Sequence, residues 1–221
     1  MRPTPSARAS SVSGAFENAI ADVRITLREP AVLRLLIALF AVRFGTMSVE
    51  PLFAIYVKSF ETHSSFVEKN LGFVNGALVS ATPLGNLLAL PAWGRAVDRS
   101  YRRAFILAAS GAALLYAPQA LAPGIGSLFA IRFLAGIFLA GVIPAAYGLV
   151  ADETPVERRG SSYSLTFSAI ALASSVAPVT GGTLVSHGIP IRWLFLGSAI
   201  PMLFGALWLW RRPSAAPAKA A

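Results

Sequence analysis

The sequence predicts an all-α polytopic membrane protein, with six transmembrane helices in a single domain. Of the 221 residues, 55% are hydrophobic and only 13% are charged, and the mean hydropathy is +0.63. A helix that crosses the hydrocarbon core needs about 20 mostly apolar residues, and polar or Pro/Gly-rich breaks separate six such runs. We expect the spans 33–55, 71–91, 104–121, 127–149, 162–185 and 191–210.

These spans fill most of the chain, so we expect one membrane domain over residues 31–212 and no separate soluble domain. Residues 1–30 are expected to form a cytoplasmic tail with a short amphipathic helix on the membrane surface, because Phe16, Ile20, Val23 and Leu27 recur at helical spacing. Residues 213–221, rich in alanine and proline, are expected to be a disordered cytoplasmic tail.

The net charge of +9 indicates orientation rather than a nucleic-acid partner. Most of the 19 Lys and Arg residues fall in the N-terminal tail, the second and fourth loops and the C-terminal tail. The positive-inside rule then places both termini in the cytoplasm, and we expect a multi-pass protein of the cytoplasmic (inner) membrane whose first partner is the lipid bilayer.

The composition argues against an enzyme. The absence of cysteine excludes disulfides, thiolate metal sites and a cysteine nucleophile. Both histidines fall in predicted loops, aspartates are few, and there is no phosphate-binding loop. We therefore expect no catalytic residues, no metal and no cofactor.

The segment between the second and third spans reads Gly94-Arg-Ala-Val-Asp98-Arg99-Ser-Tyr-Arg102-Arg103. It resembles the G-x-x-x-D-R-x-G-R-R signature of the major facilitator superfamily, which lies at the same place in each six-helix half of those transporters. The resemblance implies that Asp98, Arg99 and Arg102 form a cytoplasmic gate. Tyr101 departs from the signature, where the family usually has glycine. The alternative is that the arginines only set the topology and bind lipid phosphates.

Two further features of this predicted loop region concern its neighbours. Gly94 has no side chain, so we expect the helix end to approach another helix closely there. Arg158 and Arg159, in the predicted loop before the fifth span, are expected to be ionic partners of Asp98.

The fourth span begins with Arg132-Phe-Leu-Ala135-Gly136, which resembles the family motif R-x-x-q-G, with alanine at the usual polar position. Gly136 and Gly141 are expected to let helices pack closely. Arg132 lies at lipid depth and must find a carboxylate, a carbonyl or water. Alternatively, it lies near the outer interface and extends its charge into water.

The fifth span contains Ala173-x-x-x-Ala177-Pro178-x-x-Gly181-Gly182. It resembles the G-x-x-x-G-P-x-x-G-G motif of antiporters, with alanine at the first two glycine positions. We expect Pro178, Gly181 and Gly182 to act in helix packing and kinking.

The resemblance extends over nearly the whole chain from about residue 30, but family members usually have twelve helices in two halves. It implies a partner, either a second copy or another six-helix chain. The segment around Val49-Glu50-Pro51 resembles the start of the C-terminal half of a drug:proton antiporter. Each half in the family is a three-plus-three inverted repeat, and Ala41-Val-Arg43-Phe44 echoes Ala130-Ile-Arg132-Phe133.

Polar residues within the spans are the candidates for a cavity. Glu50 is the only acidic residue in any predicted span, and it lies seven residues after Arg43 on the same helix face, roughly 10 Å away. A buried carboxylate can exchange a proton for a substrate, so Glu50 is the candidate for proton coupling. Alternatively, Glu50 lies near the outer interface before Pro51 and pairs with Arg132 or Arg43, which would favour its charged form. Asn75 and Asn86 share one face of the second span and either line the cavity or join helices.

The resemblance implies transport of a small-molecule substrate, most plainly proton-coupled efflux of lipophilic or drug-like compounds. A cavity with aromatic residues and few fixed charges suits lipophilic compounds, often cations. The alternatives are a truncated, non-transporting half or partner subunit, and a transporter of sugars or other metabolites. Tyr56, Tyr116 and Tyr147 are more typical of interface anchors than of ligands.

Overall fold

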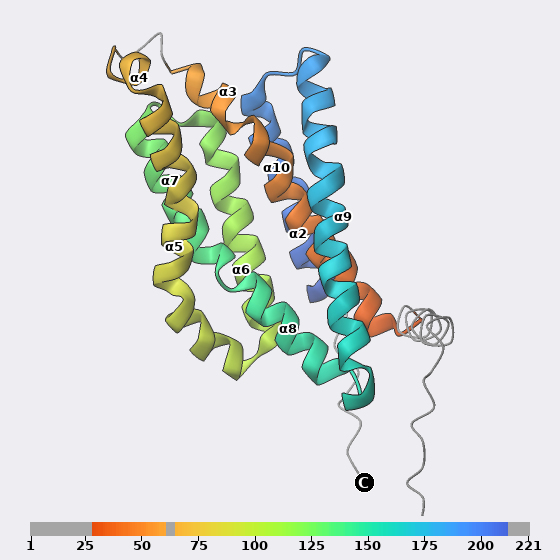
Figure 1. Cartoon of the computed structure of the whole chain (residues 1–221). Coiled ribbons are helices and arrows are strands. Elements are labelled where there is room, and N and C mark those ends of the chain that lie inside the picture. Colours follow the sequence, from red (N-terminus) through yellow and green to blue (C-terminus); the bar gives the residue numbers. More distant parts are fainter. Residues whose placement is uncertain (1–27, 61–64, 212–221) are drawn as a thin grey trace, which may run out of the picture.

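Six long helices cross the computed structural model from one end to the other (Figure 1). The structure describes residues 28–60 and 65–211. The expected tail helix and the expected disordered C-terminal tail lie outside these residues.

The first span is α2 (Pro30–Val49), continued by η1 (Glu50–Leu52) and α3 (Phe53–Lys58), and the short α4 (Ser65–Lys69) leads into the second, α5 (Leu71–Arg99). The remaining spans are α6 (Tyr101–Tyr116) with η3 (Ala117–Leu121), α7 (Ile125–Leu139) with α8 (Val142–Glu153), η4 (Val156–Arg158) with α9 (Arg159–Ser186), and α10 (Ile191–Trp210). The described residues contain no strand, and all six spans are long and apolar enough to cross a membrane. The predicted all-α, six-helix fold is confirmed.

The prediction that a loop joins the second and third spans is wrong. We expected the second span to end near Pro91, but α5 continues to Arg99, so the segment from Gly94 to Arg99 is helical. Only Ser100 interrupts the helices, with extended backbone angles, and its hydroxyl accepts a hydrogen bond from the Arg103 amide. Pro91 removes a single backbone donor, a loss that a transmembrane helix tolerates.

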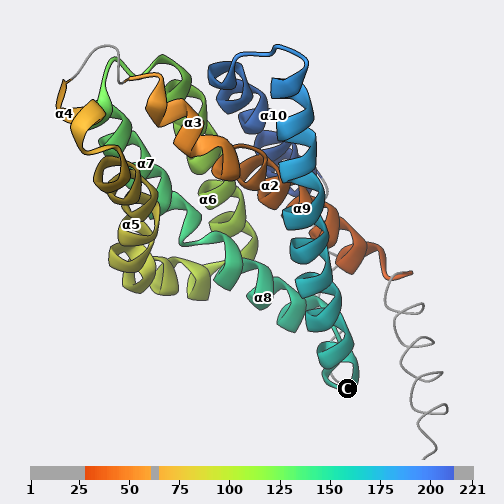
Figure 2. The same cartoon turned by 45° about the horizontal axis from the view of Figure 1, so that its top comes forward.

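The six spans form two triplets with matching contacts (Figure 2). The first triplet is α2–α3, α5 and α6, and the second is α7–α8, α9 and α10. The first helix of each triplet packs on the second and third helices of the other: α2 contacts α9 and α10, and α7 contacts α5 and α6. Exchanging the triplets reproduces this pattern, as expected for a three-plus-three repeat.

Glycines allow the two equivalent crossings to be close. A Cβ atom at Gly136 would collide with the backbone of Thr82 where α7 crosses α5. A Cβ atom at Gly181 would likewise collide with the backbone of Ser48 where α9 crosses α2. Small residues at such crossings let backbones pack directly in a membrane, where no hydrophobic effect holds helices together.

Two glycines differ from their expected packing role. A Cβ atom at Gly94 or at Gly182 would meet nothing within 4 Å among the described residues. Gly94 is exposed, and Gly182 is on a different side of α9 from Gly181, which is buried against α2. Within this bundle, neither position requires glycine for a close helix contact.

The fourth span is not continuous, because Ala140 and Gly141 separate α7 from α8. Gly141 packs against the indole of Trp93, whose ring would collide with an added Cβ atom. The Trp93 Nε1 donates a hydrogen bond of 2.6 Å to the Ile137 carbonyl, which lies near the end of α7. Pro178, by contrast, lies inside the continuous helix α9.

Candidate functional site

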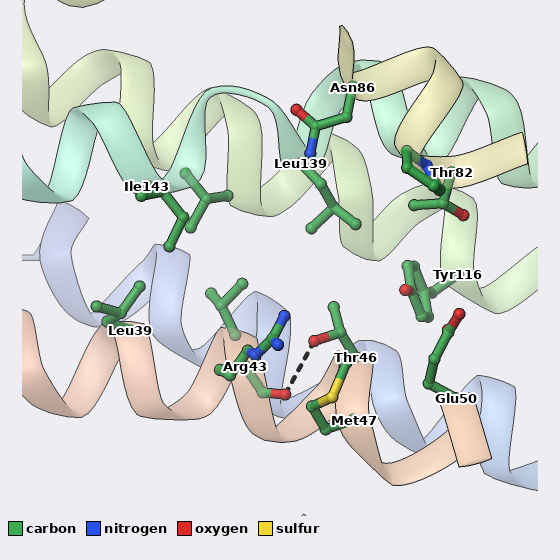
Figure 3. Close-up of a pocket in the computed structure, with 13 residues that line it drawn as sticks. Leu39, Arg43, Thr46, Met47, Glu50, Thr82, Asn86, Tyr116, Leu139 and Ile143 are labelled. Carbon is green, nitrogen blue, oxygen red and sulfur yellow. Dashed lines mark hydrogen bonds between the residues drawn. The ribbon is translucent and has the colours of Figure 1, made fainter. Parts of the chain in front are cut away.

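A cavity of about 230 Å³ lies between α2 and the helices α5 to α8 (Figure 3). Side chains from α2 and η1 form one wall, and side chains from α5, α6, α7 and α8 form the others. The cavity is lined by Leu39, Val42, Arg43, Thr46, Met47, Glu50, Thr82, Pro83, Asn86, Tyr116, Leu139, Val142 and Ile143. Arg43 and Glu50 are the two charged side chains of this lining, and the other side chains in it are neutral.

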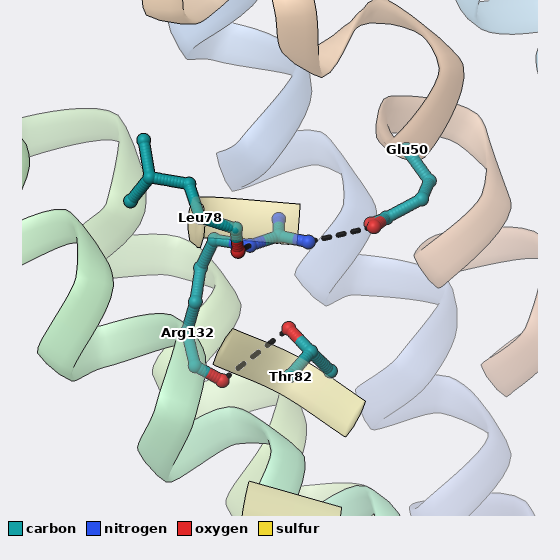
Figure 4. Close-up of polar contacts among 4 residues, drawn as sticks. All are labelled: Glu50, Leu78, Thr82 and Arg132. Atoms are coloured by element: carbon teal, nitrogen blue, oxygen red, sulfur yellow. Dashed lines mark hydrogen bonds and ion pairs between the residues drawn. The ribbon is translucent and has the colours of Figure 1, made fainter. Parts of the chain in front are cut away.

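Glu50 forms an ion pair with Arg132 at the edge of this cavity (Figure 4). The Arg132 Nη2 donates to the Glu50 Oε1 at 2.6 Å, and its Nε donates to the Leu78 carbonyl at 3.0 Å. The Arg132 guanidinium also lies 4.0 Å from the centre of the Phe53 ring. Of the two alternatives for Glu50, pairing with Arg132 is the arrangement found, and the same carboxylate lines the cavity.

The two partners differ in their access to water. The Arg132 side chain is 1% exposed, whereas the Glu50 side chain is 27% exposed. The alternative that Arg132 reaches the outer interface is therefore wrong in this structure: its charge is held inside the bundle by a carboxylate, a carbonyl and a ring. An arginine at this depth needs such partners because hydrocarbon offers none.

Arg43 occupies the equivalent place in the first triplet. Its Nε donates a hydrogen bond of 3.1 Å to the Ser174 hydroxyl on α9, just as Arg132 donates from α7 to the Leu78 carbonyl on α5. Each arginine thus joins the first helix of its own triplet to the second helix of the other. The sequence echo around the two arginines corresponds to an equivalence in space.

Sequence reasoning missed three polar residues of the cavity wall. Tyr116 is 2% exposed and lines the cavity, so its expected role as an interface anchor is wrong. The hydroxyls of Thr46 and Thr82 also line the cavity, and they donate to the carbonyls of Arg43 and Arg132 at 2.9 and 3.4 Å. No motif marks them. A signal for Tyr116 is its position four residues after Ala112 and seven after Ala109, on a buried face of small residues.

Tyr56 is not an interface anchor either. It is 7% exposed, and its hydroxyl donates to the Gln119 carbonyl at 2.7 Å. Asn86 lines the cavity, but Asn75 does not. Eleven residues along a helix are about 16 Å, so the two asparagines share a face but not a depth.

The signature residues gather at the end of the bundle where α2 begins and α10 ends (Figure 1). Asp98, Arg99 and Arg103 are exposed there. The Arg102 Nη2 donates to the carbonyls of Leu209 and Trp210, and so satisfies the last turn of α10.

The expected ionic partners of Asp98 have other contacts. Arg158 pairs with Glu29 at 3.7 Å, and the Arg159 Nη2 donates to the Ala151 carbonyl at 2.7 Å. Across the described part of the chain, no ion pair joins Asp98 to either arginine. The described residues also contain no cluster of three or more side chains able to hold a metal ion.

Comparison with known proteins gives relatives for most of the chain. The sequence model of the Major Facilitator Superfamily matches residues 35–221. The uncharacterized MFS-type transporter YuxJ of Bacillus subtilis is 32% identical over 182 residues, which are 82% of this chain and 45% of YuxJ. The multi-drug resistance efflux pump PmrA homolog of Lactococcus lactis is 26% identical, over 79% of this chain and 42% of the relative.

A third relative is the multidrug resistance protein MdtG of Salmonella heidelberg, which is 25% identical over 86% of this chain and 46% of MdtG. The chain therefore spans somewhat less than half the length of these curated relatives. No solved structure matches it.

Proposed function

The chain belongs to the major facilitator superfamily, and on this premise we propose that it forms one six-helix half, of C-terminal type, of a transporter that exports small lipophilic or drug-like compounds in exchange for protons. Two relatives are named as multidrug resistance proteins. The observation that carries the proposal is the Glu50–Arg132 ion pair, which places a titratable carboxylate in the wall of a cavity inside the bundle.

Glu50 is the residue through which a proton acts. Protonation removes the negative charge from the pair, while Arg132 remains charged and buried. Removing one partner of a buried ion pair costs about 3–5 kcal/mol, and about 5.5 kcal/mol reverses a two-state population from 1:99 to 99:1. Loss of the Glu50 charge therefore destabilises the conformation that contains the ion pair, by an amount comparable with the energy that reverses such a population.

A second bundle supplies the other side of the transport path. Only 28% of the apolar stretch of α5 and 17% of that of α9 are buried within this bundle. Their exposed large side chains include Leu84, Leu87, Leu88, Phe167, Leu172, Val176 and Val179. We assign these faces to lipid and to a second six-helix half, either another copy of this chain or a partner chain, because alternating access needs two bundles that move about one site.

The basic end of the bundle faces the cytoplasm in this proposal, in keeping with the positive-inside rule, and the membrane is the cytoplasmic one. Asp98 and Arg99 lie exposed at this end and act as a gate by forming contacts with the second half. Arg102 holds α10 from within the bundle, so its part in the gate is to keep the helix ends together.

Replacing Asp98 with asparagine is expected to slow proton-driven efflux at least about tenfold, since one lost charge-assisted hydrogen bond is worth about 1.5–3 kcal/mol. The measurement is dye efflux from cells or proteoliposomes at matched protein levels. Asp152→Asn, at an exposed aspartate in the last turn of α8, is the control. Unchanged efflux by Asp98→Asn would show that the gate assignment is wrong.

Two measurements test the proposed function itself. Subunit counting in native-like bilayers at low expression is expected to find a dimer or a stable complex with another six-helix protein. In proteoliposomes that hold this assembly, a pH gradient is expected to drive dye transport, and Glu50→Gln is expected to abolish the proton-driven part while dye binding persists.

Glu68→Gln is the matched control for Glu50→Gln, because Glu68 is an exposed carboxylate on α4, outside the cavity. This variant should transport normally. A persistent monomer without transport would favour the alternative, a non-transporting half or subunit. Proton-driven transport that survives Glu50→Gln would remove Glu50 from the coupling step.

A further inference from the structure

We infer that Arg43 binds the anionic group of the transported compound, so that the substrate class is an amphipathic anion, such as a carboxylate or sulfonate with an apolar body. The inference rests on the proposed transport function and deepens it by naming the substrate. It reverses the expectation of a cationic substrate, which follows from the composition alone. The basis is the balance of charge around the cavity.

The cavity has one positive charge that no acidic residue of the bundle compensates. Glu50 is neutralised by Arg132 at 2.6 Å. Arg43 lines the same cavity, and its Nε bonds the neutral hydroxyl of Ser174. In residues 28–60 and 65–211, Arg43 is not a member of the Glu50–Arg132 or the Glu29–Arg158 ion pair.

The repeat explains why one arginine is paired and the other is not. Glu50 follows Arg43 by seven residues and crosses to the other triplet, where it pairs with Arg132. The residue seven places after Arg132 is Leu139, which also lines the cavity. Figure 3 shows Leu139 across the cavity from the helix that bears Arg43. Position 139, where the repeat would place a carboxylate to pair with Arg43, is therefore occupied by an apolar residue.

An anion suits this arrangement on chemical grounds. A guanidinium presents parallel N–H donors that match a carboxylate, and such pairs are among the strongest hydrogen bonds in proteins. Ser174 holds the Nε, which leaves the two Nη groups for a ligand. Within a wall of low dielectric constant, the same charge repels a cation. The Asn86 amide adds a neutral donor for orientation, and the aliphatic wall takes the apolar body.

The test uses two dyes of similar shape and opposite charge, fluorescein as the anion and tetramethylrhodamine methyl ester as the cation. Their binding to the full chain in lipid nanodiscs, in its native assembly, is measured by fluorescence anisotropy without a pH gradient. The protein is expected to prefer fluorescein. Arg43→Gln is expected to weaken fluorescein binding about tenfold or more, the equivalent of one charge-assisted hydrogen bond, whereas Arg43→Lys keeps the preference for the anion.

A second pair of variants leaves Arg43 in place. Leu139→Glu supplies the absent carboxylate and is expected to weaken fluorescein binding by a similar factor. Leu139→Gln introduces a side chain of nearly the same shape as glutamate but without its charge. This variant is expected to bind fluorescein more tightly than the Leu139→Glu variant. Arg192→Gln removes one exposed charge at the start of α10, outside the cavity, and is expected to bind like the unmodified chain.

The outcomes separate this inference from the proposed function. Preference for the cation, binding of neither dye, or fluorescein binding that Arg43→Gln and Leu139→Glu both leave unchanged would overturn the inference. Proton-driven transport of the cation alone would overturn it and leave the proposed function intact. Fluorescein binding that depends on Arg43, without any transport, would support the anion site and contradict the transport function.

Discussion

Replacing Glu50 with methionine is expected to lower the free energy of unfolding by about 3–5 kcal/mol, the cost of leaving a buried charge without its partner. The cost is high because the Arg132 side chain is 1% exposed and cannot turn to water. The measurement is unfolding by a denaturing detergent in mixed micelles. Glu68→Met, at an exposed carboxylate outside the cavity, is the control and is expected to stay within about 0.5 kcal/mol.

Replacing the other partner of the ion pair, Arg132, is expected to cost less. Arg132→Met leaves Glu50 unpaired, but that side chain is 27% exposed and can be hydrated. The double variant, Glu50→Met with Arg132→Met, leaves no charge without a partner. It is expected to recover most of the lost stability, because well-packed apolar residues often replace a buried ion pair without loss. If the two single effects simply added in the double variant, the ion pair would not be the source of the stability change.

Replacing Gly181 with alanine is expected to destabilise the bundle by about 1–3 kcal/mol, the usual cost of overpacking a well-packed contact. The added Cβ atom would collide with the backbone of Ser48, and a backbone atom cannot move aside as a flexible side chain can. The α2–α9 crossing would have to open. The change in unfolding free energy in micelles measures this effect.

The neighbouring glycine provides the matched control. Gly182→Ala makes the same chemical change one residue later on the same helix, where the new Cβ atom meets nothing within 4 Å in the described bundle. It is expected to be neutral or to stabilise by up to about 1 kcal/mol, since alanine favours the helix. Equal losses for the two variants would show that the crossing does not depend on Gly181.

The number and approximate position of the spans could be predicted because hydrocarbon imposes a simple rule: each crossing needs a long apolar helix with its backbone groups paired. The helix ends were harder to predict. The charged segment from Gly94 to Arg99 continues α5 instead of forming a loop, because a helix can extend past the apolar core without losing its backbone hydrogen bonds. Gly141 packs against Trp93, and it also lies at a break in the fourth span that the sequence pattern did not indicate.

The sequence by itself determined the fold class, the family resemblance and the pair of arginines in equivalent helices. These follow from hydropathy and from local motifs, which are properties of short stretches of chain. Only the tertiary structure decided which arginine has a carboxylate, because that depends on how α2 and α7 meet around one cavity. It pairs Arg132 with Glu50 and leaves Arg43 facing the cavity beside a neutral hydroxyl. It also moved Tyr116 from an expected interface position to the cavity wall, since the packing of helices, and not their hydropathy, sets which face of each helix turns inward.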